Sequence, residues 1–168
     1  MDLELSATAR RQPGQERDVR YRDMVAGEEQ ALLALVMRGF DELVRPDFSD
    51  EGVSEFTRAA QSFVMERPDG HRITIAERGG QIVGMVDVRD SCHVSLFFVE
   101  PDDRGHGVGR TLLESAIECC LSAEPGLSAI TVNSSPWAVP VYERLGFVAT
   151  GSEIERNGIR ALPMAKPL

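Results

Sequence analysis

The chain has 168 residues, of which 42% are hydrophobic and 27% charged, as expected for one globular domain that folds without metals or disulfides. The formal charge of −9 disfavours nucleic acid as a partner, because phosphate binding depends on clusters of Lys and Arg. No apolar run approaches the ~20 residues of a membrane helix, so no membrane partner is predicted.

The amino-terminal residues have the composition of a tail. Residues 1–18 mix acidic residues with Arg and Gln, and they lack the apolar stretch of a secretory signal. We expect a disordered tail over residues 1–18 and a single domain over residues 19–168, which opens with a short strand at 19–23.

Two helices are expected next. From Glu28 onward, apolar residues recur at helical spacing until Pro46 breaks the pattern. Ser49 is a suitable N-cap for a second helix, because Asp50 and Glu51 then fall in its first turn, where negative charge is favourable.

The rest of the chain changes repeatedly between strand and helix periodicity. Arg-Gly-Gly at 78–80 and Asn-Gly at 157–158 are hairpin signals. The expected elements are strands at 72–77, 81–89, 93–99, 129–133, 147–150 and 159–165, and helices at 108–121 and 138–145. This order predicts an α/β fold with one mixed sheet and helices on both of its faces.

The strongest functional signal is Val-Glu-Pro-Asp-Asp-Arg-Gly-His-Gly-Val-Gly-Arg at 99–110, where a buried strand leads through a glycine-rich turn into an amphipathic helix. Such a turn directs backbone N–H groups outward at a helix N-terminus, which binds pyrophosphate well. Its glycines let the main chain approach a ligand, and Arg104 or Arg110 can add positive charge. The pattern is neither the dinucleotide motif G-x-G-x-x-G nor a Walker loop. Taken alone, it is equally consistent with an ordinary helix entry.

A second segment at 133–147 begins with Asn at a strand end and closes with Tyr-Glu-Arg-Leu-Gly-Phe. In this order, with one helix and one strand between them, the two segments resemble the acetyl-CoA motifs of the GCN5-related N-acetyltransferase (GNAT) family. The first segment matches that family's R-x-x-G-x-G at residues 104–109. Pro140 departs from the plainest family pattern and is tolerable only if the short helix begins near Ala138.

The resemblance implies a fold, a co-substrate and residue roles. The fold would be a twisted, mostly antiparallel mixed sheet of about seven strands, and the co-substrate would be acetyl-CoA. The main chain at Phe98 and Val99 would bind the pantetheine arm and polarise the thioester carbonyl. Tyr142 would act as general acid toward the CoA sulfur; without the motif it would be taken for a packing tyrosine. The predicted cofactor-binding residues are Phe98, Val99, Arg104, Gly105, His106, Gly107, Val108, Gly109, Arg110 and Asn133.

The acceptor amine must lose a proton before it attacks, because an amine with a pKa near ~10.4 is almost wholly protonated at neutral pH. Some family members carry a carboxylate early on the central strand, and the matching place here is near His93, which is suited to proton transfer at pH 7. We therefore predict Tyr142 and His93 as catalytic residues. Glu100 and water are alternatives for the base, and His93 could equally be a solvent-facing strand residue.

These inferences predict an N-acetyltransferase that moves acetyl from acetyl-CoA directly to an amine of a small molecule or protein, through a tetrahedral intermediate. The alternatives are transfer of a longer acyl group, transfer to a hydroxyl, and a CoA-binding regulatory module without catalysis. The acidic composition gives weak support to a cationic acceptor. Self-association as a homodimer is compatible with this function.

The cysteine and histidine patterns complete the prediction. An odd number of cysteines, with Cys119 and Cys120 adjacent, argues against a disulfide framework and for a reducing, cytoplasmic compartment. Cys120 falls in the apolar stripe of its helix, which packing explains. The three histidines are scattered singly, so no metal site is predicted.

Overall fold

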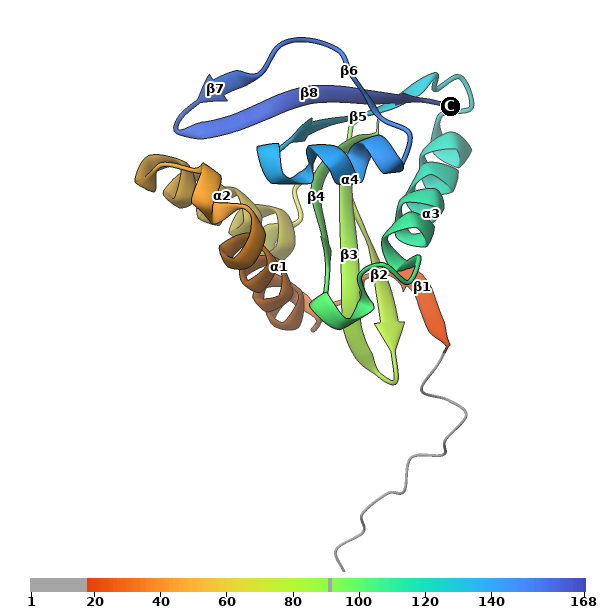
Figure 1. The fold of residues 1–168 in the computed structure, drawn as a ribbon. Coiled ribbons are helices and arrows are strands. Elements are labelled where there is room, and N and C mark those ends of the chain that lie inside the picture. Colours follow the sequence, from red (N-terminus) through yellow and green to blue (C-terminus); the bar gives the residue numbers. More distant parts are fainter. Residues whose placement is uncertain (1–17, 91) are drawn as a thin grey trace, which may run out of the picture.

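The computed structural model describes residues 18–90 and 92–168, so the tail predicted over residues 1–18 lies almost wholly outside the described part. The described residues form four α-helices around an eight-stranded sheet (Figure 1). The strands are β1 (Val19–Asp23), β2 (His71–Arg78), β3 (Gln81–Arg89), β4 (His93–Val99), β5 (Ala129–Ser134), β6 (Val148–Ala149), β7 (Ile154–Arg156) and β8 (Ile159–Pro167). The helices are α1 (Glu29–Leu43), α2 (Asp50–Gln61), α3 (Val108–Ala123) and α4 (Val139–Arg144).

The sheet has the strand order β1-β2-β3-β4-β5-β8-β6, and β7 pairs with β8 outside this path. All neighbouring strands are antiparallel except β4 and β5, which are parallel. This confirms the predicted mixed, mostly antiparallel sheet. The strand β7 was not predicted, because its three residues are all exposed and leave no hydrophobic pattern.

Local signals in the sequence set the helix boundaries. The Ser49 hydroxyl accepts a hydrogen bond from the Gly52 N–H at 3.2 Å, which is the predicted N-cap of α2. Pro140 lies in the first turn of α4, where its missing N–H costs nothing. A short 3₁₀ turn, Pro136–Ala138, leads into this helix. Gly146 has a φ of +94° and ends the helix in the left-handed conformation that glycine adopts readily.

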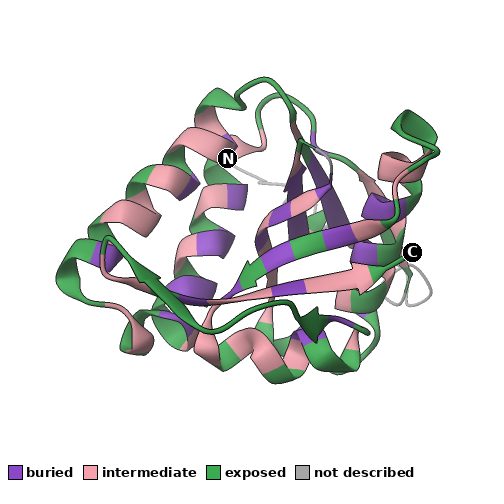
Figure 2. Cartoon of the chain, turned by 90° about the horizontal axis from the view of Figure 1, so that it is seen from above, coloured by how far each residue is buried: buried purple, intermediate pink, exposed green. Residues whose placement is uncertain are grey.

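Helices cover the two faces of the sheet with separate apolar cores (Figure 2). On one face, Leu32 and Val36 of α1 pack with Ile75 and Met85 of the sheet. On the other face, Leu112 and Leu113 of α3 pack with Val86 and Ile130 of the sheet. No helix in the described part of the chain is both long and apolar enough to cross a membrane.

The cysteine prediction is wrong, because Cys92 and Cys120 form a disulfide. Cys92 lies in the turn between β3 and β4, and Cys120 lies near the end of α3, with 5.9 Å between their Cα atoms. The packing of α3 across the sheet brings together two residues that are 28 positions apart. Sequence spacing alone does not show such a contact. Cys119 keeps a free thiol.

Candidate active site

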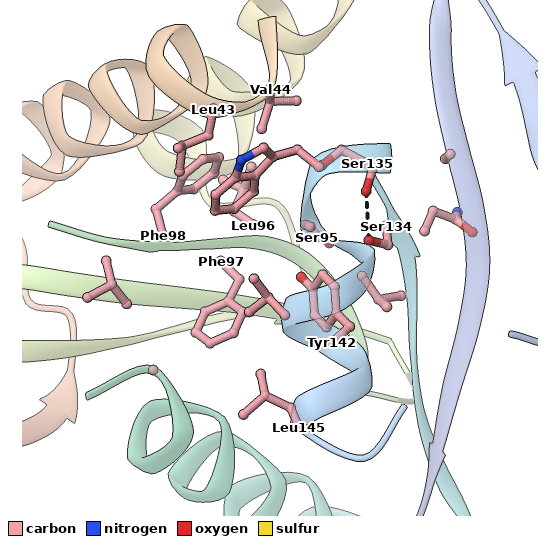
Figure 3. Close-up of a pocket in the computed structure, with 18 of the residues that line it drawn as sticks. Leu43, Val44, Ser95, Leu96, Phe97, Phe98, Ser134, Ser135, Tyr142 and Leu145 are labelled. Atoms are coloured by element: carbon pink, nitrogen blue, oxygen red, sulfur yellow. Dashed lines mark hydrogen bonds between the residues drawn. The ribbon is translucent and has the colours of Figure 1, made fainter. Parts of the chain in front are cut away.

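The site lies where two central strands separate. β4 and β5 pair in parallel only at His93 with Thr131 and at Val94 with Val132. Beyond these pairs a cavity of about 580 Å³ opens between the strands, and α4 borders it (Figure 3). This volume is typical of a ligand site. The cavity lining includes residues 95–99 of β4 and its carboxyl end, and residues 132–135 of β5 and the turn after it.

The glycine-rich turn forms one end of the cavity. Gly105 and Gly107 have φ values of +75° and +85°, and a Cβ on either would meet no atom within 4 Å. Gly107 is the N-cap of α3, and the first intrahelical bond runs from the Thr111 N–H to the Gly107 carbonyl at 3.0 Å. The earlier N–H groups of the helix are therefore open to a ligand, and the cradle fits a pyrophosphate.

The side chains of two predicted cofactor residues do not line the cavity. The Val108 side chain is 2% exposed and packs into the core, so only its N–H at the start of α3 is available to phosphate. His106 is exposed in the turn and does not line the cavity. The lining does include Phe98, Val99, Asn133 and Gly109. A Cβ on Gly109 would lie only 3.3 Å from the ring of Phe97, so a larger residue would crowd this ring.

Arg104 and Arg110 line the cavity while also holding the structure together. Arg104 donates from Nε to the Val99 carbonyl at 2.8 Å and from both Nη atoms to the carboxylate of Glu42 on α1, at 3.0 Å each. Arg110 donates to the Arg144 carbonyl at the end of α4, at 3.2 Å. Both arginines considered for phosphate binding thus line the cavity, and both are anchored to neighbouring elements.

Tyr142 lies in the middle of the cavity wall. Tyr142 is 6% exposed, and the centroid of its ring lies 6.1 Å from that of Phe97 and 5.1 Å from that of Phe147. In Figure 3 the hydroxyl end of Tyr142 points toward the side of the cavity where Ser95 lies. Burial raises the pKa of the Tyr142 hydroxyl well above its usual value, so the phenol stays protonated at neutral pH.

The two bases considered from the sequence do not line this cavity. His93 is at the closed end of the strand split, where its Nδ1 lies 2.8 Å from Thr131 Oγ1. Burial, and then the charge of Arg89, lower the pKa of His93. Glu100 forms an ion pair with Arg38 of α1 on another part of the surface. The structure therefore does not bring His93 or Glu100 together with Tyr142.

The sequence placed the acceptor against the two amino-terminal helices and the loop at 45–49, but it singled out no lining residue there. Phe48, just before α2, and Phe56 of α2 line the cavity. The ring of Phe56 is in edge contact with the ring of Phe98, with 6.3 Å between their centroids. Trp137, 44% exposed, also lines the cavity. Aromatic residues at helix spacing are usually core residues, so no motif marked them. Ser95 is a second omission, and its position inside an apolar strand was the available signal.

The charge of the cavity differs from that of the whole protein. The charged side chains among the described residues that line it are all arginines, namely Arg104, Arg110, Arg144 and Arg160. The excess of acidic residues in the sequence is thus carried outside this lining. Phosphates are favoured in this cavity, and its lining gives no support to an acceptor with a second positive charge. Among the described residues, no cluster of His, Cys, Asp and Glu is placed to hold a metal ion.

Comparisons with known proteins agree with this geometry. A family model described as "Acetyltransferase (GNAT) domain" matches residues 44–168. The chain is 36% identical over 134 residues to the peptidyl-lysine N-acetyltransferase YjaB of Escherichia coli (strain K12), covering 79% of this chain and 83% of that relative. It is 25% identical over 162 residues to the S-(2-succino)cysteine N-acetyltransferase of Bacillus subtilis (strain 168), covering 89% and 96% of the two chains.

Solved structures show the same arrangement of elements. A crystal structure from Rhodopseudomonas palustris, described as "GCN5-Related N-acetyltransferase: Aminotransferase, Class-II", superposes with a TM-score of 0.74 at 25% identity. The match covers 89% of this chain and 95% of that structure.

Proposed function

The chain belongs to the GNAT family of acetyltransferases and is an acetyl-CoA-dependent N-acyltransferase, and we propose that it acetylates its acceptor directly in the cavity between β4 and β5. The observation that supports this most strongly is the alignment of three chemical features along one cavity. These features are the glycine cradle, the Tyr142 phenol, and an aromatic end formed with α2. They correspond to phosphate binding, thiolate protonation and acceptor binding.

Each end of the cavity has its own role in this proposal. The N–H groups at the start of α3 hold the pyrophosphate of acetyl-CoA, and Arg110 adds positive charge beside it. The pantetheine arm lies in the split, where the β4 main chain at Phe98 and Val99 has no β5 partner and can bind it through groups other than the Val99 carbonyl, which accepts from Arg104. Acetyl-CoA supplies the activated acyl group when it is bound.

Tyr142 is proposed to protonate the CoA thiolate. A phenol whose pKa is raised by burial keeps its proton until a strong base forms beside it, and the leaving thiolate is such a base. The contacts with Phe97 and Phe147 fix the ring, so that the hydroxyl has one position relative to the split. No covalent acyl-enzyme is part of the proposal: Cys120 is in a disulfide, and the lining includes no cysteine among the described residues.

The acceptor proposed here is an amine with an apolar or aromatic body, on a small molecule or a peptide. The relatives named for peptidyl-lysine and S-(2-succino)cysteine acetylation support either size of acceptor. Apolar surface at the proposed acceptor end comes from Phe48, Phe56 and Trp137. The described residues that line the cavity include no carboxylate that could bind a second ammonium group, which disfavours polyamines. Cytoplasmic location and a homodimer stay predictions, and the disulfide removes the cysteine argument for the former.

The test is release of CoA thiol from acetyl-CoA across a panel of amines matched in size. We expect phenethylamine-type acceptors and peptides with an apolar residue beside the amine to exceed spermidine and free lysine in kcat/KM. Longer acyl-CoA donors and hydroxyl acceptors in the same assay test the two enzymatic alternatives. Binding of acetyl-CoA without thiol release from any amine would instead indicate a regulatory CoA-binding module.

Trp137 offers a variant for the same test. Because it is 44% exposed, Trp137→Ala should leave the fold intact while raising KM for aromatic amines. Trp137→Phe is the matched control, since it keeps an aromatic surface. An unchanged KM in Trp137→Ala would show that the acceptor does not contact this side chain.

A further inference from the structure

A fully buried carboxylate lies on the α1–α2 side of the sheet, opposite Leu96, which belongs to the cavity lining. Asp87 of β3 is 0% exposed, and its Oδ2 lies 2.7 Å from Nδ1 of His71 on β2. The antiparallel register of β2 and β3 brings these two residues together. The ring of Phe63 covers His71 at 4.4 Å between centroids. A carboxylate in an apolar interior is costly, so its presence calls for an explanation.

The other oxygen of this carboxylate is unused. Asp87 Oδ1 is buried and has no hydrogen-bond partner among the described residues. An orphaned acceptor on a buried carboxylate is rare in native proteins, because it loses hydration without compensation. The Asp87 carboxylate therefore has one oxygen fixed by His71 and one oxygen free to accept a hydrogen bond or a proton.

Ser95 lines the cavity, and its hydroxyl is one of the groups that act on the Asp87 carboxylate. In the β3–β4 pairing, Asp87 is opposite Leu96 and Val88 is opposite Val94, so Ser95 is an extra residue in a bulge. Bulges redirect side chains, and Ser95 lines the cavity. Arg89 Nε donates to Ser95 Oγ at 3.0 Å, which leaves the hydroxyl hydrogen of Ser95 available for another acceptor.

The electrostatics of Asp87 suit a proton acceptor at neutral pH. Burial raises the pKa of Asp87 to about 6, although His71, Arg89 and the Ser95 hydroxyl each lower it. The titratable groups that act on it are His71 from β2 and Arg89 from its own strand, and Arg89 also contacts Asp90 at 3.2 Å. The helical segments over this face contribute apolar side chains, including Phe63 and Val64. Such a carboxylate is mostly ionised at pH 7 yet basic enough to take a proton.

We propose that Asp87 accepts the proton of the acceptor ammonium through Ser95, with His71 as the residue that positions the carboxylate. An N–H bond of the ammonium breaks and its proton passes to Ser95 Oγ, while the hydroxyl hydrogen of Ser95 passes to Asp87 Oδ1. The electron pair left on nitrogen then attacks the thioester carbonyl. After product release, Asp87 returns the proton to solvent through the cavity.

This proposal rests on the proposed function and supplies the base that His93 and Glu100, both outside the cavity lining, do not. It is tested with the pH profile of kcat/KM, using acetyl-CoA and an amine that the enzyme acetylates. The unmodified enzyme should lose activity below about pH 6. In Asp87→Asn, kcat/KM at pH 7 should fall by about 10²-fold or more. The remaining activity should rise about tenfold per pH unit, because only amine already deprotonated in solution reacts.

Two further variants separate the relay from a structural role. Ser95→Ala should show the same loss and the same new pH dependence, with acetyl-CoA affinity by calorimetry unchanged. In His71→Ala the acid limb should move to higher pH, because a group that lowers the pKa of Asp87 is lost. Thr74→Val is the matched control, since Thr74 is a buried polar residue of β2 whose hydroxyl has no hydrogen-bond partner within residues 18–90 and 92–168; it should keep the rate and the profile.

Three outcomes would overturn the proposal. The first is a wild-type pH profile in Asp87→Asn. The second is an unchanged profile in Ser95→Ala. The third is a loss in Asp87→Asn that is equal at every pH and is accompanied by weaker acetyl-CoA binding, which would indicate structural damage. An unmodified enzyme that acetylates no amine would contradict the proposed function itself, whereas acetylation that is independent of Asp87 would contradict only the relay.

Discussion

Arg104 and Glu42 connect the end of β4 to α1 through two parallel hydrogen bonds of 3.0 Å. The Arg104 guanidinium lowers the pKa of Glu42, so the pair is ionised at neutral pH. Because Arg104 also lines the cavity, Glu42 occupies a guanidinium that could otherwise face a phosphate.

Replacing Glu42 should therefore affect the co-substrate more than the fold. In Glu42→Gln the competing charge is lost, and we expect acetyl-CoA to bind about two- to fivefold more tightly in calorimetry. Glu55→Gln breaks another exposed Arg–Glu pair, on α2, and controls for the change in net charge. Equal affinities in the two variants would show that Arg104 does not interact with the phosphates.

The glycine cradle predicts a selective loss of acetyl-CoA binding in Gly107→Val. A branched Cβ would occupy open space that the pyrophosphate needs, and the φ of +85° adds strain of roughly 1–3 kcal/mol. Gly80 in the β2–β3 turn is a matched control, with a φ of +81° and open space around a Cβ. We expect Gly80→Val to lose similar stability and to bind acetyl-CoA normally. Normal binding by Gly107→Val would place the phosphates elsewhere.

The disulfide predicts a stability that depends on the redox state. Closing a loop between residues 28 positions apart stabilises the folded state by roughly 3.6 kcal/mol in the chain-entropy model. Reductant should therefore lower the unfolding temperature by roughly 7–14 °C. Cys92→Ser should show the lowered temperature without reductant, and Cys119→Ser should behave like the unmodified protein. An unfolding temperature that is the same with and without reductant would show that the two thiols are not paired in solution.

Asp87 predicts a stability difference that depends on pH. Its pKa is raised from 3.8 to about 6 in the folded state, so the folded protein disfavours the carboxylate form. The resulting destabilisation is absent below pH 4, grows between pH 4 and 6, and reaches on the order of 3 kcal/mol above pH 6. Asp87→Asn should gain stability relative to the unmodified protein over that interval. Urea unfolding at pH 4, 5, 6 and 8 measures it, and a difference independent of pH would contradict the pKa shift.

Local patterns in the sequence predicted most of the fold. The β3 and β4 boundaries, the Ser49 cap and the start of α3 follow from periodicity and capping, which act over a few residues. The exposed strand β7 has no apolar pattern to detect. The Cys92–Cys120 bond joins elements that meet only after the sheet has formed.

The candidate site shows the same division between local and long-range information. Consecutive motif residues identified the cradle and Tyr142. The His71–Asp87 pair depends on strand register, and the cavity position of Ser95 depends on a one-residue bulge, neither of which the sequence reveals. The all-arginine charge of the lining is likewise opposite in sign to the composition, because net charge does not report where charges lie.

Tyr142 is the residue on which the proposed chemistry depends most. Tyr142→Phe keeps the ring and its contacts with Phe97 and Phe147 but removes the proton donor. Because general acid catalysis typically contributes 10²–10⁴-fold, kcat should fall by roughly that factor. Acetyl-CoA affinity should change little, since the pyrophosphate cradle lies on another element.

The most direct measurement is single-turnover acetylation by Tyr142→Phe and by the unmodified enzyme, at saturating acetyl-CoA and amine, from pH 6 to 9. We predict a rate constant lower by at least about 10²-fold across this range, with the acetyl-CoA dissociation constant within about twofold of the original. A rate constant equal to that of the unmodified enzyme would contradict the account, because the thiolate would then be protonated by water or another residue.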